Sequence, residues 1–212
     1  MEILHRVVGP VATNVWILGD EASREAIAID TATPCVGWLT GQLAERGWTL
    51  KLIVSTHRHW DHIGDNAAVS AATGADIAVH GLDRHGLEHP AAANAPFLIP
   101  PSVPAVELAE GGRVGFGAFD LEVLHTPGHT EGSVCLLARE AGVLLSGDTL
   151  FAGAWGRTDL TGGSEAAMAD SLARLARLEP SLSVFPGHGA TTTIERERSW
   201  LDLVARQGRL FA

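Results

Sequence analysis

The sequence lacks several residue types that would point to particular kinds of site. It contains no tyrosine, and Lys51 is its single lysine. The two cysteines, Cys35 and Cys135, lie far apart in the chain and form no CxxC pair. This pattern favours two reduced, partly buried thiols over a disulfide framework or a cysteine-based metal site.

Long apolar runs and basic stretches are also missing. No run approaches the roughly 20 apolar residues of a membrane span. The N-terminal stretch MEILHRVVGPVATNVW has no basic segment followed by an apolar one, as a signal peptide would. The sequence therefore predicts a soluble, cytoplasmic protein with no membrane partner.

Negative charge exceeds positive charge, with 25 Asp and Glu against 15 Lys and Arg and a formal net charge of −10. Phosphate backbones require a surface rich in Lys and Arg, so a nucleic-acid partner is not expected. A small anionic substrate held by one or two arginines remains compatible with this balance.

The 212 residues are 46% hydrophobic and 19% charged, which suits a single domain over 1–212 with a sizeable core. Apolar strand patterns alternate with amphipathic helix patterns, which indicates an α/β fold. We expect strands at 14–20, 25–30, 50–57, 75–80 and 182–189, paired strands within 111–129 and 133–148, and helices at 36–47, 61–74, 164–180 and 192–207. The segment 89–104 carries five prolines and little periodicity. It predicts a long surface loop, either functional or a plain connector.

Seven residues with metal-ligating side chains follow apolar strand-like runs. In α/β sheets, the loops after strand ends are where sites assemble. Imidazole and carboxylate groups suit zinc, iron and manganese. The residues lie in the stretches THRHWDH, TPGHT, SGDT and PGHG, and they are His57, His59, Asp61, His62, His129, Asp148 and His188.

The spacing within HRHWDH indicates two metal sites. His57 and His59 are two residues apart, so in an extended segment they point to the same side, and Asp61 would continue that phase. His62 would begin the helix and turn toward a different point. One such stretch supplies too few ligands for two sites, so the remainder must come from the other three stretches.

These motifs resemble those of the metallo-β-lactamase superfamily over nearly the whole chain. The resemblance implies an αβ/βα sandwich, in which two mixed β-sheets pack face to face with helices outside. It implies one divalent metal ion at His57, His59 and His129, a second at Asp61, His62 and His188, and Asp148 as a bridge. The ions would be zinc, with iron or manganese as alternatives.

The same resemblance implies hydrolysis of an acyl group by a hydroxide that bridges the two ions. Asp61 and His62 would be the catalytic residues among the ligands, because Asp61 can also orient the hydroxide. Asp30 would lie beneath the site and orient a ligand histidine.

The segment LFAGAWGRTDLTGG resembles the glyoxalase II-like branch, which acts on glutathione thioesters and related thiol compounds. It implies that Arg157 and Asp159 lie near the cleft, either as substrate contacts or as a structural pair that supports the metal loop. That branch grips glutathione through a C-terminal helical region with tyrosine and basic residues. This sequence continues only for one predicted helix after PGHG and has no tyrosine, so those contacts cannot be carried over.

Two alternatives share the resemblance. Persulfide dioxygenases also carry GRTD and use a single iron, which His57, His129 and Asp148 would hold here. Lactonases and other ester hydrolases need the same attack on a carbonyl carbon. The sequence favours a small acyl or thioester substrate, and it does not predict the oligomeric state.

Overall fold

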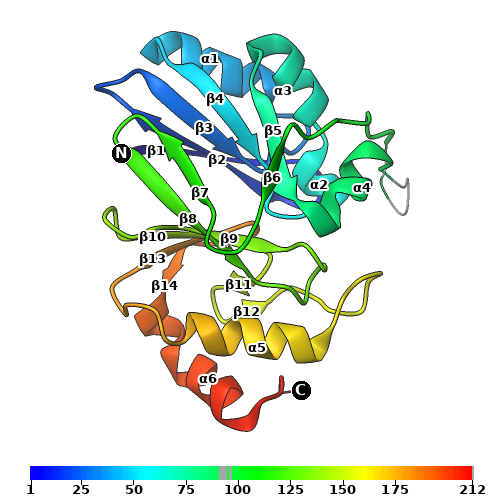
Figure 1. Ribbon diagram of the computed structural model, residues 1–212, viewed down its shortest axis with the longest axis vertical. Helices are drawn as coiled ribbons and strands as arrows, with labels where there is room; N and C mark the ends of the chain where they lie inside the picture. Colours follow the sequence, from blue (N-terminus) through cyan, green and yellow to red (C-terminus); the bar gives the residue numbers. More distant parts are fainter. Residues whose placement is uncertain (91–94, 96, 212) are drawn as a thin grey trace.

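Two six-stranded β-sheets face each other in the computed structural model, with helices on their outer surfaces (Figure 1). The structure describes residues 1–90, 95 and 97–211. The expected αβ/βα sandwich of two mixed sheets is confirmed. A third, two-stranded sheet joins β11 (Leu150–Phe151) to β12 (Ala154–Trp155).

The first sheet runs in chain order. Its strands are β1 (Glu2–Val8), β2 (Thr13–Asp20), β3 (Glu25–Ile29), β4 (Thr49–Val54), β5 (Asp76–His80) and β6 (Val106–Leu108). The last four strands pair in parallel, so their carboxyl ends lie at one edge of the sheet. Because both faces of this sheet are covered, β3 is apolar and buried along most of its length.

The second sheet has the order β14-β13-β10-β9-β8-β7. Strand β10 is parallel to β13 and antiparallel to β9, which is itself antiparallel to β8. The carboxyl ends of β8, β10 and β13 therefore share one edge. The bounds are β7 (Arg113–Phe116), β8 (Phe119–His125), β9 (Val134–Ala138), β10 (Val143–Gly147), β13 (Ser183–Pro186) and β14 (Thr192–Thr193).

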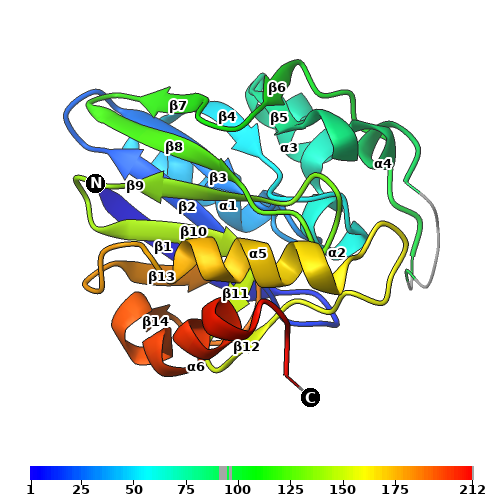
Figure 2. The same cartoon turned by 60° about the horizontal axis from the view of Figure 1, so that its bottom comes forward.

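Two pairs of helices cover the outer faces. Helices α1 (Val36–Arg46) and α3 (Asn66–Thr73) cover the first sheet, and α5 (Glu165–Leu175) and α6 (Ile194–Gln207) cover the second (Figure 2). Ser164 caps α5 by accepting a hydrogen bond from the Ala167 amide. Met168, Leu172 and Leu175 face inward from the same helix, which explains its amphipathic pattern.

The single helix expected over 61–74 is wrong. The structure has two helices, α2 (Trp60–Ile63) and α3, separated by Gly64 and Asp65. The Asp65 carboxylate accepts hydrogen bonds from the backbone amides of Cys35 and Val36, at the start of α1. The interruption thus lets Asp65 satisfy amides of another helix, which local helix propensity cannot reveal.

The segment 89–104 is only partly a surface loop. It follows a 3-10 turn (Gly81–Asp83) and α4 (Arg84–Glu88), and its described residues form no helix or strand. Ile99 is buried in the core, and the Ser102 amide donates to the Leu87 carbonyl, so 97–104 packs against the domain. The part of the predicted loop at 91–94 and 96 lies outside the described residues.

Several strands were not predicted from the sequence. Strands β6, β11, β12 and β14 are two or three residues long, too short to show a period of two. Strand β1 lies at the edge of its sheet and carries exposed His5 and Arg6, which weaken its apolar pattern.

Both cysteines are unpaired and buried. Burial raises the pKa of the Cys135 thiol to about 11 and raises that of Cys35 further. The two thiols therefore behave as small core side chains.

Among the described residues, no helix is long and apolar enough to cross a bilayer.

Candidate metal centre

The seven candidate residues gather where the two sheets meet at their carboxyl edges. His57 and His59 follow β4, while Asp61 and His62 lie in α2. The other three follow β8, β10 and β13, and they are His129, Asp148 and His188. Parallel strands bring these chain segments to the same edge, although the residues span most of the sequence.

Three histidines form the first group. His57, His59 and His129 each offer a ring nitrogen, and these nitrogens lie within 4.8 Å of one another. Nδ1 of His59 lies 2.8 Å from Nε2 of His129. The structure thus brings together the three residues that the sequence assigned to one ion.

A second group combines Asp61, His62 and His188, again with ligand atoms within 4.8 Å. Oδ2 of Asp61 lies 3.4 Å from Nε2 of His62 and 3.1 Å from Nε2 of His188. Asp61 does not continue the phase of His57 and His59, because α2 begins at Trp60. The helical turn carries Asp61 away from the first group and toward the second.

Asp148 lies between the two groups. Its Oδ1 is 3.4 Å from Nε2 of His62, and its Oδ2 is 3.4 Å from Nε2 of His129 and 3.6 Å from Nε2 of His188. This carboxylate therefore reaches both groups. Gly187 makes the approach feasible, since a Cβ there would meet both Asp148 and His62.

Hydrogen bonds on the outer side of the rings set which nitrogens carry protons. Nδ1 of His129 lies 2.7 Å from the Arg157 carbonyl oxygen, and Nδ1 of His188 lies 3.1 Å from that of Val11. A carbonyl oxygen only accepts, so each Nδ1 must donate. In the neutral ring, Nε2 is then a lone pair that points into the cluster.

Asp30 orients the ring of His62 directly and that of His57 through the Thr56 hydroxyl. Its Oδ2 lies 2.9 Å from Nδ1 of His62 and also accepts from Oγ1 of Thr56 at 2.8 Å. The Thr56 hydroxyl has thereby used its proton, so Nδ1 of His57 donates to it at 3.1 Å. The inner Nε2 atoms of His57 and His62 are therefore lone pairs in the neutral rings as well.

Convergent lone pairs without donors fit bound cations. Nε2 of His57 and Oδ1 of Asp148 are buried and have no hydrogen-bond partner among the described residues. Ligand atoms around a tetrahedral zinc are about 3.3 Å apart when the bonds are about 2.0–2.1 Å long. Separations of 3.1–3.6 Å around Asp61 and Asp148 match that spacing. The residues present thus offer sets of ligand atoms that fit divalent metal ions.

Burial and neighbouring charges push the histidine pKa values in opposite directions. Burial lowers the pKa of His57 and His129, and it lowers that of His59 to about 3. Burial acts the same way on His62, but the carboxylates of Asp148, Asp61 and Asp30 outweigh it and raise the pKa well above its ordinary value. Burial lowers the pKa of His188, but its hydrogen bond to Asp61 and the charges of Asp148 and Asp61 together outweigh burial and raise it.

These shifts predict that acidification empties the second group before the first. A metal ion competes with protons more strongly at His62 and His188, whose pKa values are raised, than at the first three histidines, whose pKa values are lowered. Affinity at the second group should fall about tenfold per pH unit for each proton displaced. Equilibrium dialysis from pH 8 to pH 5.5 should show one ion lost before the other. Simultaneous loss of both ions would contradict the assignment.

Asp83 is a buried residue that the sequence did not reveal. It follows β5, is completely buried, and accepts hydrogen bonds from the Arg58 amide and guanidinium. It also accepts from the Thr130 hydroxyl and the Gly132 amide. The carboxylate therefore ties the loop of His57 and His59 to the loop of His129. No local motif marks Asp83, and only its place after a strand that ends at this edge hints at it.

Asn14 holds the loop of His188 from the opposite sheet. Its side-chain amide donates to the carbonyl oxygens of Pro186 and Gly189, and its backbone amide donates to that of Gly187. The sequence did not single out this residue. Thr13, beside it, donates to Oδ2 of Asp61 at 3.3 Å. The start of β2 thus positions two members of the second group.

Arg157 and Asp159 lie at the rim rather than inside the cluster. Nε and one terminal nitrogen of Arg157 each donate to the Asp159 carboxylate at 2.7 Å, and both side chains are exposed. The guanidinium group holds the pKa of Asp159 down at about 2. Only the backbone of Arg157 contacts the candidate ligands, through its carbonyl oxygen and His129.

Trp60 lies between the candidate ligands His59 and Asp61 in the sequence. Its ring meets that of Phe97 edge-on at 5.6 Å and packs against the core of the first sheet.

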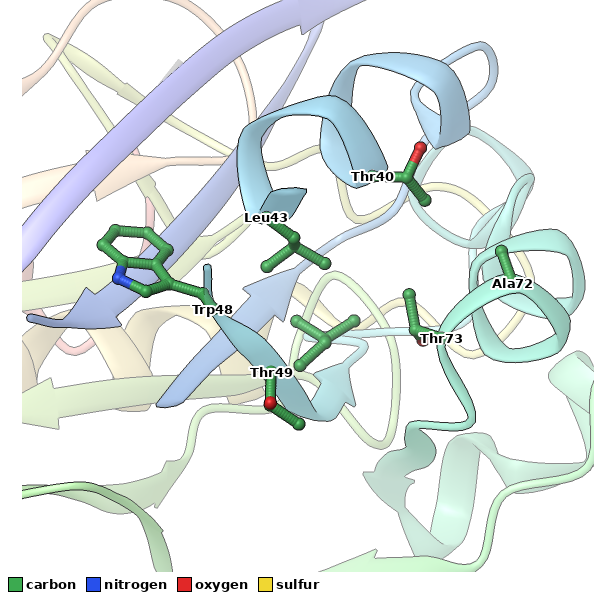
Figure 3. A pocket seen from close by; sticks show the side chains of 7 residues that line it. Thr40, Leu43, Trp48, Thr49, Ala72 and Thr73 are labelled. Atoms are coloured by element: carbon green, nitrogen blue, oxygen red, sulfur yellow. The ribbon is translucent and has the colours of Figure 1, made fainter. Parts of the chain in front are cut away.

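A separate hollow of about 290 Å³ lies between α1 and α3 at the start of β4 (Figure 3). The candidate ligands follow the other end of β4, and none of the hollow's lining residues is titratable. They are Thr40, Leu43, Trp48, Thr49, Leu50, Ala72 and Thr73.

Sequence comparisons give the family context. A family model described as the Metallo-beta-lactamase superfamily matches residues 8–188. An uncharacterized protein of Mycobacterium leprae is 36% identical over 90% of this chain and 92% of its own length. A hydroxyacylglutathione hydrolase of Thermosynechococcus vestitus is also 36% identical, over 89% of this chain and 68% of its own length.

Solved structures show the same architecture. The BLEG-1 B3 metallo-beta-lactamase aligns with a TM-score of 0.85 and 31% identity, over 96% of this chain and 99% of that one. TTHA1623 in a di-iron-bound form gives 0.82 and 34% identity, over 92% and 96%. ETHE1 from Myxococcus xanthus gives 0.81 and 29% identity, over 97% and 85%.

Proposed function

Because this chain belongs to the metallo-beta-lactamase superfamily, we propose that it is a binuclear metallohydrolase that cleaves a thioester or a similar acyl compound. The observation that carries the proposal is the convergence of histidine ring nitrogens on the Asp148 carboxylate. Within this cluster, Nε2 of His57 and Oδ1 of Asp148 are buried and have no hydrogen-bond partner among the described residues. A single ion would leave one of the two groups without a cation. The proposal therefore includes both ions.

The residues divide between the two ions as the contacts suggest. His57, His59 and His129 would hold one ion, Asp61, His62 and His188 the other, and Asp148 would contact both. When bound, such ions lower the pKa of water and polarise a carbonyl oxygen. Zinc suits these imidazole and carboxylate ligands, and the di-iron-bound neighbour makes iron the principal alternative.

The protein's own groups prepare the reaction. Asp61 stays ionised because, despite the opposing effect of burial, its neighbour His62 lowers its pKa, and the Thr13 hydroxyl holds its Oδ2. An ionised carboxylate in that position can accept a hydrogen bond from the attacking water and orient it. Asp30 and Thr56 hold the rings of His62 and His57 in place. These residues thus assemble the site before the substrate arrives.

Hydrolysis adds one water across the acyl bond. The water oxygen forms a bond to the acyl carbon, the carbon–sulfur bond breaks, and the electron pair leaves with sulfur. The sulfur takes up a proton to become a thiol, and the other product is a carboxylate. Thioester chemistry in particular is supported by the GRTD segment and by relatives named hydroxyacylglutathione hydrolase.

Metal analysis combined with turnover tests this proposal. We expect two zinc ions per chain and hydrolysis of simple acyl thioesters, followed by release of free thiol. Asp61→Ala should reduce kcat by more than about 100-fold, since it removes a ligand and the orienting carboxylate together. Failure of the protein with two bound ions to hydrolyse any acyl thioester or lactone would contradict the proposal.

Oxidation of a persulfide at one iron is the second candidate. It would require only His57, His129 and Asp148, and the similarity to ETHE1 keeps it in consideration. The geometry of Asp61, His62 and His188 favours the hydrolase, because persulfide oxidation at a single iron would not need this second set of ligands. Oxygen uptake by iron-loaded protein with glutathione persulfide, without thioester hydrolysis, would decide for oxidation.

A further inference from the structure

Two guanidinium groups flank the first histidine group, and both are already paired. Arg58 places one terminal nitrogen 2.6 Å from Asp83 and donates with the other to the Thr161 carbonyl oxygen at 2.8 Å. Glu131 lies 3.5 Å from the same guanidinium group. Because Asp83 is completely buried, this pair cannot separate without stranding a charge in the core.

Arg157 is the second guanidinium group, and it is paired at the rim itself. Asp159 accepts from two of its nitrogens in the parallel geometry that guanidinium and carboxylate groups prefer. The pair is exposed, and the Arg157 carbonyl oxygen touches His129, so it lies beside the cluster. It presents a neutral unit, with the carboxylate as exposed as the guanidinium.

The nearby cations on other segments do not supply the missing charge. Arg84, on the helix after Asp83, pairs with Glu88 at 2.8 Å. Arg6 lies on the same face of β1 as Leu4 and Val8, and those two side chains pack in the core beneath α1. Its side chain therefore belongs to the helix-covered face of the first sheet.

Exposed apolar side chains lie beside the second group and next to the Arg157–Asp159 pair. At the second group, the ring of Phe151 lies 6.1 Å from that of His188, and Val11, whose carbonyl oxygen contacts His188, is 46% exposed. At the rim pair, Leu160 follows Asp159 in the sequence and is 37% exposed. Exposed apolar groups around a polar site provide contact area for an uncharged ligand.

We infer that the substrate is a thioester whose leaving thiol carries no net negative charge. This inference rests on the proposed function and names its substrate class. The acyl carbon must reach the metal cluster, so the distal part of the thiol must lie across the rim. There it meets apolar groups and paired guanidinium groups, on a protein with a formal net charge of −10. A thiol with carboxylates, such as glutathione, would find both of these guanidinium groups already paired, and the net negative charge of the protein would repel it.

Two thioesters with the same acyl group test the inference. S-lactoylglutathione carries two carboxylates and one ammonium group on its thiol, whereas S-lactoyl-N-acetylcysteamine carries no charge. We expect kcat/KM of the zinc-loaded protein to be about tenfold higher for the neutral ester at low ionic strength. The ratio should shrink with added salt, because screening weakens repulsion of the anionic ester only.

The outcomes separate the inference from the function on which it rests. Equal or higher kcat/KM for S-lactoylglutathione would overturn the inference and leave the hydrolase intact. Turnover of neither ester by protein with two bound zinc ions would contradict the proposed function, and the inference would fall with it.

Variants at the rim provide an independent readout. Asp159→Asn should free Arg157 to bind a carboxylate and raise kcat/KM for S-lactoylglutathione several-fold relative to the neutral ester. The matched control removes both charges, with Arg157→Gln added to Asp159→Asn, and should return the ratio to the wild-type value. An unchanged ratio in the single variant would show that pairing of Arg157 does not set the preference, and it would count against the inference.

Discussion

Asp148→Asn is expected to remove at least one of the two metal ions proposed for the site and to reduce kcat/KM by at least about 1,000-fold. Asparagine keeps the shape of the side chain but removes the charge that lies between the two groups. Substitution of a residue that only hydrogen-bonds to a metal ligand typically costs 10–100-fold in metal affinity or activity. Loss of a ligand shared by both ions should therefore cost more. Metal content by mass spectrometry and thioester turnover measure the two effects.

Folding should survive this change, which makes the result interpretable. Oδ1 of Asp148 has no hydrogen-bond partner among the described residues, so the substitution breaks no hydrogen bond there. Cooperative unfolding of the metal-free variant checks this. The matched control is Asp170→Asn, which makes the same chemical change at an exposed position on α5 and should retain both ions. Two ions and full turnover in Asp148→Asn would refute the assignment.

Asp83→Ala is expected to lower the free energy of unfolding by about 3–5 kcal/mol, the usual result of removing one partner of a buried ion pair. The substitution leaves the Arg58 guanidinium without the Asp83 carboxylate, leaves the Gly132 amide without its acceptor, and removes one of the two partners of the Thr130 hydroxyl. In a chain of this length, the melting temperature should fall by about 10 °C. Urea unfolding of metal-free protein measures the loss.

Metal affinity provides the second readout, because a purely structural role would not affect the two groups differently. Asp83 joins the loops of His57 and His129, so the first ion should bind about 10–100-fold more weakly, with a smaller effect on the second. Adding Arg58→Met to Asp83→Ala should restore part of the stability, since no buried charge remains unpaired.

The exposed pair of Arg84 and Glu88 provides the comparison for Asp83. Removing Arg84 should cost only about 0.3–0.5 kcal/mol, as is usual for pairs one helical turn apart. A stability loss of that small size in Asp83→Ala would contradict the role assigned to the buried carboxylate.

Much of the architecture could be predicted because its signals are local. Glycine at the end of α1, the serine cap of α5 and the apolar period of α5 all lie within a few neighbouring residues. The break between α2 and α3 was missed because its cause lies in distant contacts of Asp65 with the start of α1. The shortest strands were missed because two or three residues show no periodicity.

The sequence by itself determined which ligand types the chain offers and that they follow strand ends. Those properties depend on neighbouring residues, so a spacing such as that in HRHWDH expresses them directly. The tertiary structure decided which ring nitrogens face inward, how Asp61 turns to the second group, and that Asp83 ties two loops together. It also decided that Arg58 and Arg157 are paired rather than open to a substrate. The physical reason is that hydrogen bonds and charge pairing between residues far apart in the chain exist only after the two sheets have packed.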